Sequence, residues 1–125
     1  MKINFYLEES MGDPTPWCST DVGGANDVDL LACLLLDDGG LPLGCTISWL
    51  DEGLSRIISV RNAEKVFTEW VRETWVADIS MSEVKVYSLH DEEFAVTISL
   101  DDFEKALLGW RNFVVSFQQG EKFLG

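Results

Sequence analysis

The sequence predicts an α+β fold: a single domain, residues 1–125, built on a mostly antiparallel sheet of about five strands, with two or three helices packed on one face. Three observations predict it. Short stretches alternate apolar and polar residues, as half-buried strands do. Longer stretches repeat apolar residues every three or four positions, as amphipathic helices do. With 125 residues, 46% of them hydrophobic, the chain has the size and the apolar content for one core.

The first strand is expected at the N-terminus, where Ile3, Phe5 and Leu7 alternate with polar residues. From Ser10 to Asn26 the chain is rich in glycine, proline, serine and threonine, which predicts a long loop. Long loops inside a compact domain are usually functional or mobile. Trp17 on this loop is interpreted either as a core anchor or as a contact residue.

The apolar run at residues 28–37 leaves helix and strand both open. Asn26 and Asp27 are suitable caps for a helix from Val28 to Asp37, and Gly39 is a suitable residue to follow its end. The same run is also typical of a buried strand, because short, wholly apolar segments lack a distinguishing period.

Two strands and a helix are predicted in the middle of the chain. Leu43 to Trp49 alternates strictly and predicts a strand, and the turn at residues 51–53 leads to an antiparallel return strand from Leu54 to Val60, which is rich in β-branched residues. From Asn62 to Thr74 apolar residues recur at helical spacing, which predicts an amphipathic helix.

A hairpin and a final helix complete the predicted fold. The strands Glu83–Leu89 and Phe94–Leu100 flank an acidic loop at residues 90–93. Ser99 to Asp102 resembles a capping box with aspartate in the last position. The apolar stripe from Phe103 to Phe117 then predicts a second amphipathic helix.

The cysteines and the N-terminus indicate a cytoplasmic protein. Met1 to Glu9 turns acidic before a signal-peptide core forms, and the apolar run Leu30–Leu36 is too short to span a membrane. Cys18, Cys33 and Cys45 are odd in number and widely spaced, so they fit neither a disulfide framework nor a zinc knuckle. We expect reduced thiols, with Cys33 and Cys45 as small core residues.

The sequence contains no recognisable catalytic constellation. Its one histidine, His90, stands among acidic residues in the predicted hairpin loop, where an exposed turn residue is expected. One histidine and three scattered cysteines do not form a zinc motif. We therefore expect neither enzymatic activity nor a catalytic residue, and we expect no cofactor and no bound metal.

The acidity of the chain carries the functional prediction. It has 22 Asp and Glu against 9 Lys and Arg, a net charge of -13, which argues against binding nucleic acid or anionic membranes. Helix starts and turns account for the positions of many acids, but not for the shortage of compensating cations. We expect a cationic protein partner, drawn in by the negative field.

The C-terminal strand and the segment SLDDFEKALLGWRNF at residues 99–113, with the size and acidity of the whole chain, resemble bacterial immunity proteins of polymorphic toxin systems, including contact-dependent growth inhibition. The resemblance implies a small α+β protein of the cytoplasm that binds a cognate toxin, often a basic nuclease, and neutralises it by stoichiometric inhibition. It carries no motif from which individual functional residues are transferred.

Three acidic clusters and one aromatic residue are the candidate partner-binding residues. They are Trp17 as an anchor, and Asp37, Asp38, Asp51, Glu52, Asp91, Glu92 and Glu93 as partners of lysine and arginine. For each acid the alternative is a solvated turn residue. The alternative function is a non-catalytic subunit or adaptor of an intracellular complex, and a monomer is the favoured state.

Overall fold

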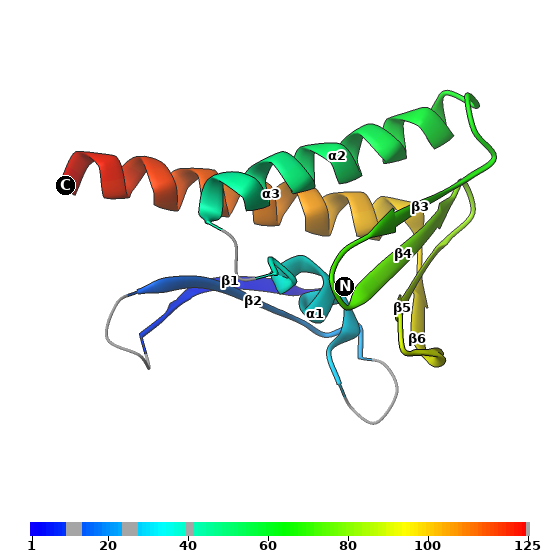
Figure 1. The fold of residues 1–125 in the computed structure, drawn as a ribbon, viewed down its shortest axis with the longest axis horizontal. Helices are drawn as coiled ribbons and strands as arrows, with labels where there is room; N and C mark the ends of the chain where they lie inside the picture. Colours follow the sequence, from blue (N-terminus) through cyan, green and yellow to red (C-terminus); the bar gives the residue numbers. More distant parts are fainter. Residues whose placement is uncertain (10–13, 24–27, 40–41, 125) are drawn as a thin grey trace.

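The computed structural model describes residues 1–9, 14–23, 28–39 and 42–124 (Figure 1). The elements are β1 (Ile3–Glu8), β2 (Thr15–Thr20), α1 (Leu30–Leu36), α2 (Leu43–Arg61), β3 (Phe67–Val71), β4 (Trp75–Ser80), β5 (Val84–Ser88), β6 (Asp91–Ile98) and α3 (Leu100–Leu124). In the described residues the strands form two antiparallel sheets, the pair β1-β2 and the four-stranded sheet β3-β4-β5-β6. The α+β class is confirmed, whereas the single sheet of about five strands is replaced by these two sheets.

Figure 1 shows α2 and α3 side by side, with the β1-β2 hairpin and the four-stranded sheet below them. The short helix α1 lies between the hairpin and the sheet and contacts β2, β4 and β5. Its apolar residues fill this space, since Leu30, Leu31, Leu34 and Leu35 are fully buried. No helix in the described ranges is both long enough and apolar enough to cross a membrane.

Trp70 of β3 joins the four-stranded sheet to the two long helices. Its ring stacks on Trp49 of α2, with the ring centroids 4.1 Å apart, and meets Phe103 of α3 edge-on at 6.2 Å. Gly53 permits this packing, because a Cβ atom there would lie 2.8 Å from the Trp70 ring and 2.9 Å from Leu107. The backbone of α2 therefore lies directly against the indole.

The hairpin packs against the middle of α3. Phe5 of β1 lies 6.2 Å from Trp110 and 5.7 Å from Phe113 between ring centroids, stacked in both cases. Cys18, opposite Phe5 in the hairpin, is buried, and burial raises the pKa of its thiol to about 12.

The predicted strands Leu43–Trp49 and Leu54–Val60 are wrong, because both belong to the helix α2. Its buried face is formed by residues spaced three or four apart, namely Thr46, Trp49, Leu50, Gly53, Ile57 and Val60. Each predicted strand was only seven residues long, and over so short a segment the apolar residues of a helix can also fit the two-residue alternation of a strand. The helical twist also turns Cys45 outward, so its predicted core position is wrong, while Cys33 is half-buried.

The predicted helix Asn62–Thr74 is also wrong. Asn62 caps the C-terminus of α2, and Ala63 adopts the left-handed conformation with φ of 59°, which stops the helix. The chain then enters β3, where buried Thr68 and Trp70 alternate with exposed neighbours. The next strand, β4, follows within the same hairpin and has no counterpart in the sequence prediction.

The predicted loop Ser10–Asn26 contains the strand β2, so this prediction is wrong for residues 15–20. Pro16 and Cys18 are buried, and Trp17 between them is 41% exposed, which rules out its role as a core anchor. Prolines and small polar residues gave this segment the composition of a loop. Among the described strands β2 pairs only with β1, and such an edge strand tolerates Pro16. Residues 14 and 21–23 lie outside any strand or helix, as predicted, and residues 10–13 and 24–26 of the predicted loop lie outside the described residues.

The open choice at residues 28–37 is resolved as a helix. The side chain of Asp29 caps α1 by accepting a hydrogen bond from the Ala32 amide at 3.2 Å. The predicted caps Asn26 and Asp27 lie outside the described residues.

The first strand, the last hairpin and the last helix are confirmed. The hydroxyl of Ser99 accepts a hydrogen bond from the Asp102 amide at 3.1 Å, as expected for the predicted cap. The hairpin turn is shorter than predicted, because β6 already begins at Asp91. Residues 91–93 are thus strand residues rather than loop residues, while His90 is exposed in the turn as expected.

Gly53 and Gly44 provide a matched test of the packing of α2. Gly53→Ala should lower the free energy of unfolding by about 1–3 kcal/mol, because the added methyl group collides with Trp70 and Leu107. Gly44→Ala, in the same helix, should be neutral or stabilising by up to about 1 kcal/mol, because the nearest atom lies 4.0 Å away. Urea denaturation measures both. Equal effects of the two substitutions would contradict the close contact.

Candidate functional site

The four-stranded sheet has one covered face and one open face. Trp70, Ala77, Ile79 and Val86 point toward the helices and are buried in the core. The alternate residues point to the other side, which no described helix covers (Figure 1). This outer face, as aligned by the strand register, consists of Phe67, Glu69, Val71, Val76, Asp78, Ser80, Lys85, Tyr87, Ala95 and Thr97.

An acidic cluster, defined as Glu69, Asp78 and Glu92, lies at this face, which Glu92 reaches through its ion pair with Lys85. Glu69 lies directly opposite Asp78 across the β3-β4 ladder, an arrangement of like charges that destabilises a sheet. Lys85 lies opposite Asp78 on the other side and approaches Glu92, with Nζ 3.8 Å from Oε1. The Lys85 ammonium also lies 5.0 Å from the centre of the Tyr87 ring. One lysine thus stands among three carboxylates.

The surroundings of Asp78 disfavour its charge. Partial burial raises the pKa of Asp78, and repulsion from Glu69 and Glu92 acts in the same direction, against the Tyr87 hydrogen bond and Lys85. The Tyr87 hydroxyl donates to Oδ1 of Asp78 at 3.2 Å. Burial and the same carboxylate raise the pKa of Tyr87 to about 12, so this phenol remains a donor at neutral pH. A cation brought to this face would therefore be stabilised by both Asp78 and Glu69.

Apolar side chains flank the acidic cluster. Phe67 and Val71 of β3 are 51% and 49% exposed. Val76, opposite both Val71 and Tyr87, is 1% exposed although it lies on the outer face, so its neighbours already exclude water there. A water-excluding centre next to exposed apolar side chains and charged groups is typical of a protein-binding surface.

The predicted acids of α1 and α2 have structural partners. Oδ2 of Asp37 accepts hydrogen bonds from the amides of Thr74 and Trp75 at 2.9 and 3.1 Å, so it holds the β3-β4 turn. Asp51 forms an ion pair with Arg111 of α3, and Glu52 forms one with Arg56 at 2.8 Å. These intramolecular contacts explain the positions of the three acids without a second protein.

The remaining predicted site residues are divided between two places. Trp17 and Asp38 line a cavity of about 60 Å³ between the hairpin and the helices. Asp91 accepts a hydrogen bond from the Glu93 amide at 3.0 Å, beside the β5-β6 turn. Of the predicted acids, Glu92 reaches the outer face, where it forms an ion pair with Lys85.

Sequence reasoning missed Glu69, Asp78 and Tyr87. Glu69 lay in a predicted helix, and Asp78 lay in a segment to which no strand was assigned. The available signal was the alternation of Val76, Asp78 and Ser80 with the apolar residues between them, which is typical of a strand. Only the strand register shows that Asp78 faces Glu69. Within the described ranges, no three His, Cys, Asp or Glu side chains are placed to hold a metal ion together.

Comparisons of the chain with protein families, curated proteins and solved structures each find no match. The functional evidence is then the surface chemistry of the chain itself. The outer face combines like charges, a partly buried carboxylate and exposed apolar side chains.

Asp78→Asn tests the electrostatic strain on the outer face. Asparagine still accepts the Tyr87 hydrogen bond but removes the disfavoured charge, so the free energy of unfolding should rise by up to about 1 kcal/mol at pH 7. Because the folded pKa of Asp78 lies above the unfolded value of 3.8, wild-type stability is lost as pH rises through the folded pKa. The difference in the free energy of unfolding between the variant and the wild type should therefore become smaller as pH falls toward 3.8.

Denaturation at several pH values measures this difference, and Glu9→Gln, an exposed glutamate beyond β1, is the control. A destabilised Asp78→Asn variant, or a difference that does not change with pH, would contradict the strain.

Proposed function

We propose that this chain is an immunity protein that binds a basic toxin domain through the outer face of its four-stranded sheet and inhibits it stoichiometrically, without chemistry of its own. The observation that carries the proposal is the opposed pair of Glu69 and Asp78, which lowers the stability of the isolated protein. A surface arrangement that lowers the folding stability of the isolated protein is expected where binding of a partner compensates for the loss.

Approach of the partner is electrostatic. The net charge of -13 generates a long-range field that accelerates encounter with a basic protein by about one to three orders of magnitude. Several of the basic residues are already engaged within the chain, since Arg56, Arg61, Lys85 and Arg111 each form an intramolecular ion pair. Each of these pairs also neutralises a carboxylate, so the long-range attraction comes from the acidic residues in excess of the basic ones.

Binding then places lysine or arginine side chains of the partner against Glu69 and Asp78. In the shielded complex such charge-assisted hydrogen bonds are stronger than at an open surface. They would favour the ionised form of Asp78 and lower its pKa, so binding would release protons below neutral pH. Where those cations normally hold nucleic-acid phosphates, their capture inhibits the toxin.

The second candidate function is a non-catalytic subunit of a larger complex. Exposed apolar residues next to the sheet favour it, with Val66 at 89% and Met81 at 58% exposure. A subunit of this kind would co-purify with a housekeeping assembly, whereas an immunity protein binds the product of one adjacent gene.

The direct test is co-expression with the product of the gene immediately upstream. That product should be toxic when expressed alone, and the wild-type chain should rescue growth. The double variant Glu69→Gln/Asp78→Asn should bind at least about tenfold more weakly and rescue poorly, because two partners of the toxin cations are lost. Titration calorimetry at increasing salt should show affinity falling in the wild type.

Two exposed glutamates, Glu69 in β3 and Glu9 just after β1, form the matched control. Glu69→Gln should weaken binding, whereas Glu9→Gln, which removes the same charge from the hairpin side, should leave affinity within about twofold. A non-toxic upstream product, full rescue by the double variant, or an affinity independent of salt would each refute the proposal.

A further inference from the structure

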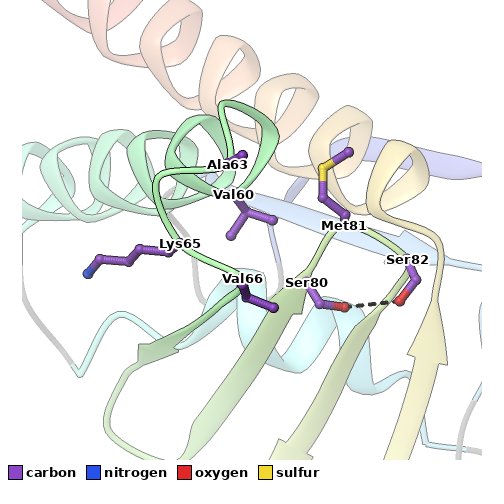
Figure 2. A pocket seen from close by; sticks show the side chains of 7 residues that line it. All are labelled: Val60, Ala63, Lys65, Val66, Ser80, Met81 and Ser82. Carbon is purple, nitrogen blue, oxygen red and sulfur yellow. Dashed lines mark hydrogen bonds between the residues drawn. The ribbon is translucent and has the colours of Figure 1, made fainter.

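A cavity of about 300 Å³ opens where α2 ends beside the four-stranded sheet. Figure 2 shows the side chains around it, which come from the end of α2, the following turn and the β4-β5 turn. They are Val60, Ala63, Lys65, Val66, Ser80, Met81 and Ser82. The left-handed Ala63, which stops the helix, turns the chain here and so forms one wall of the cavity.

The polar groups around the cavity are occupied or turned away. The Ser80 hydroxyl donates to the carbonyl of Glu83 at 2.9 Å and lies 3.2 Å from the hydroxyl of Ser82. The Lys65 side chain points away from Val60 and Val66 in Figure 2. The remaining lining is aliphatic or thioether, so the cavity suits an apolar group rather than a polar ligand.

The apolar rim of the cavity is exposed to an unusual degree. Val66 is 89% exposed and Met81 is 58% exposed, although both lie beside a concave, largely apolar surface. Exposed apolar side chains grouped around a depression are typical of protein contact sites, and methionine adapts its shape to what it meets.

The cavity borders the outer face. Ser80, which lines the cavity, lies opposite Phe67 on the β3-β4 ladder, and the next rung on this face is the pair of Glu69 and Asp78. Two residues along a strand span about 6.6 Å. Because Val60 belongs to the core on the helix side, the cavity opens at the end of the sheet, and a partner segment that bends around this end from the outer face contacts both the cavity and the acidic cluster.

We propose that the cavity is the anchor site of the interface and that it takes one bulky aliphatic side chain of the basic partner. The residues flanking that side chain are lysines or arginines that pair with Glu69 and Asp78, which rests on the proposed function. The charge of the acidic cluster selects a basic partner. The buried aliphatic side chain slows dissociation of the complex, because buried apolar anchors dominate interface energetics.

The test uses two synthetic peptides of ten residues in which lysine alternates with serine. One has leucine at its centre and the other has serine. Titrations into the isotope-labelled full chain, followed by NMR, should give about tenfold tighter binding of the leucine peptide. The backbone amides of Ala63, Val66 and Met81 should shift with the leucine peptide alone.

Two double variants are compared. Val66→Ser/Met81→Ser removes the apolar rim at exposed positions, and it should make the affinities for the two peptides equal. Ile58→Ser/Leu108→Ser is the control, because both residues are exposed, at 54% and 45%, and neither lines the cavity. Ile58 points to another side of α2, two residues from Val60. This control should keep the preference for leucine.

The outcomes separate the two proposals. Salt-dependent binding of both peptides with equal affinity would overturn the anchor site and leave the acidic face standing. The absence of salt-dependent binding by either peptide would overturn the proposed function as well. Self-association of the chain that Val66→Ser/Met81→Ser abolishes would show that a second copy occupies the cavity, which also overturns the anchor site for a basic partner.

Discussion

The packing of Trp70 between the two long helices is the constraint on which the rest of the structure depends. Its indole lies against Trp49, Phe103 and the bare backbone at Gly53, so β3 has one possible orientation. Successive residues of a strand point to opposite faces. Once Trp70 points inward, Glu69 and Val71 point outward, and the register carries the same division across the other strands. The outer face is thus a consequence of core packing.

The same packing explains why acidic residues play two different roles. Asp37 holds the β3-β4 turn, while Arg72 beside it lies 4.5 Å over the Trp49 ring and donates to the Asp37 carbonyl at 3.1 Å. This network stabilises the end of the Trp70 strand. Asp78 accepts a hydrogen bond from Tyr87, but it also faces Glu69 across the ladder and is partly desolvated, so its negative charge is disfavoured. Asp37 thus supports the fold, whereas Glu69 and Asp78 place like charges side by side on the outer face.

The sequence correctly predicted segments in which a periodic pattern continues over many residues, or in which a capping residue stands next to the element it caps. The stripe from Phe103 to Phe117 and the Ser99 cap gave the last helix, and alternation gave β1 and the β5-β6 hairpin. The segments 43–61 and 62–74 failed because short apolar runs fit two periods, and the left-handed Ala63 was not recognisable in advance. The candidate site was therefore sought among acids adjacent in sequence, such as Asp51 and Glu52, which have partners of their own. Strand pairing, a long-range property, brings Glu69 and Asp78 together.

The outer face as the binding surface is tested most directly by mapping the complex. The isotope-labelled chain is titrated with the product of the gene immediately upstream, and NMR shifts are followed residue by residue. Binding through the outer face predicts the largest shifts at Glu69, Asp78 and Tyr87. Shifts confined to the hairpin around Trp17, or to α2 around Asp51 and Glu52, with Glu69 and Asp78 unchanged, would contradict it.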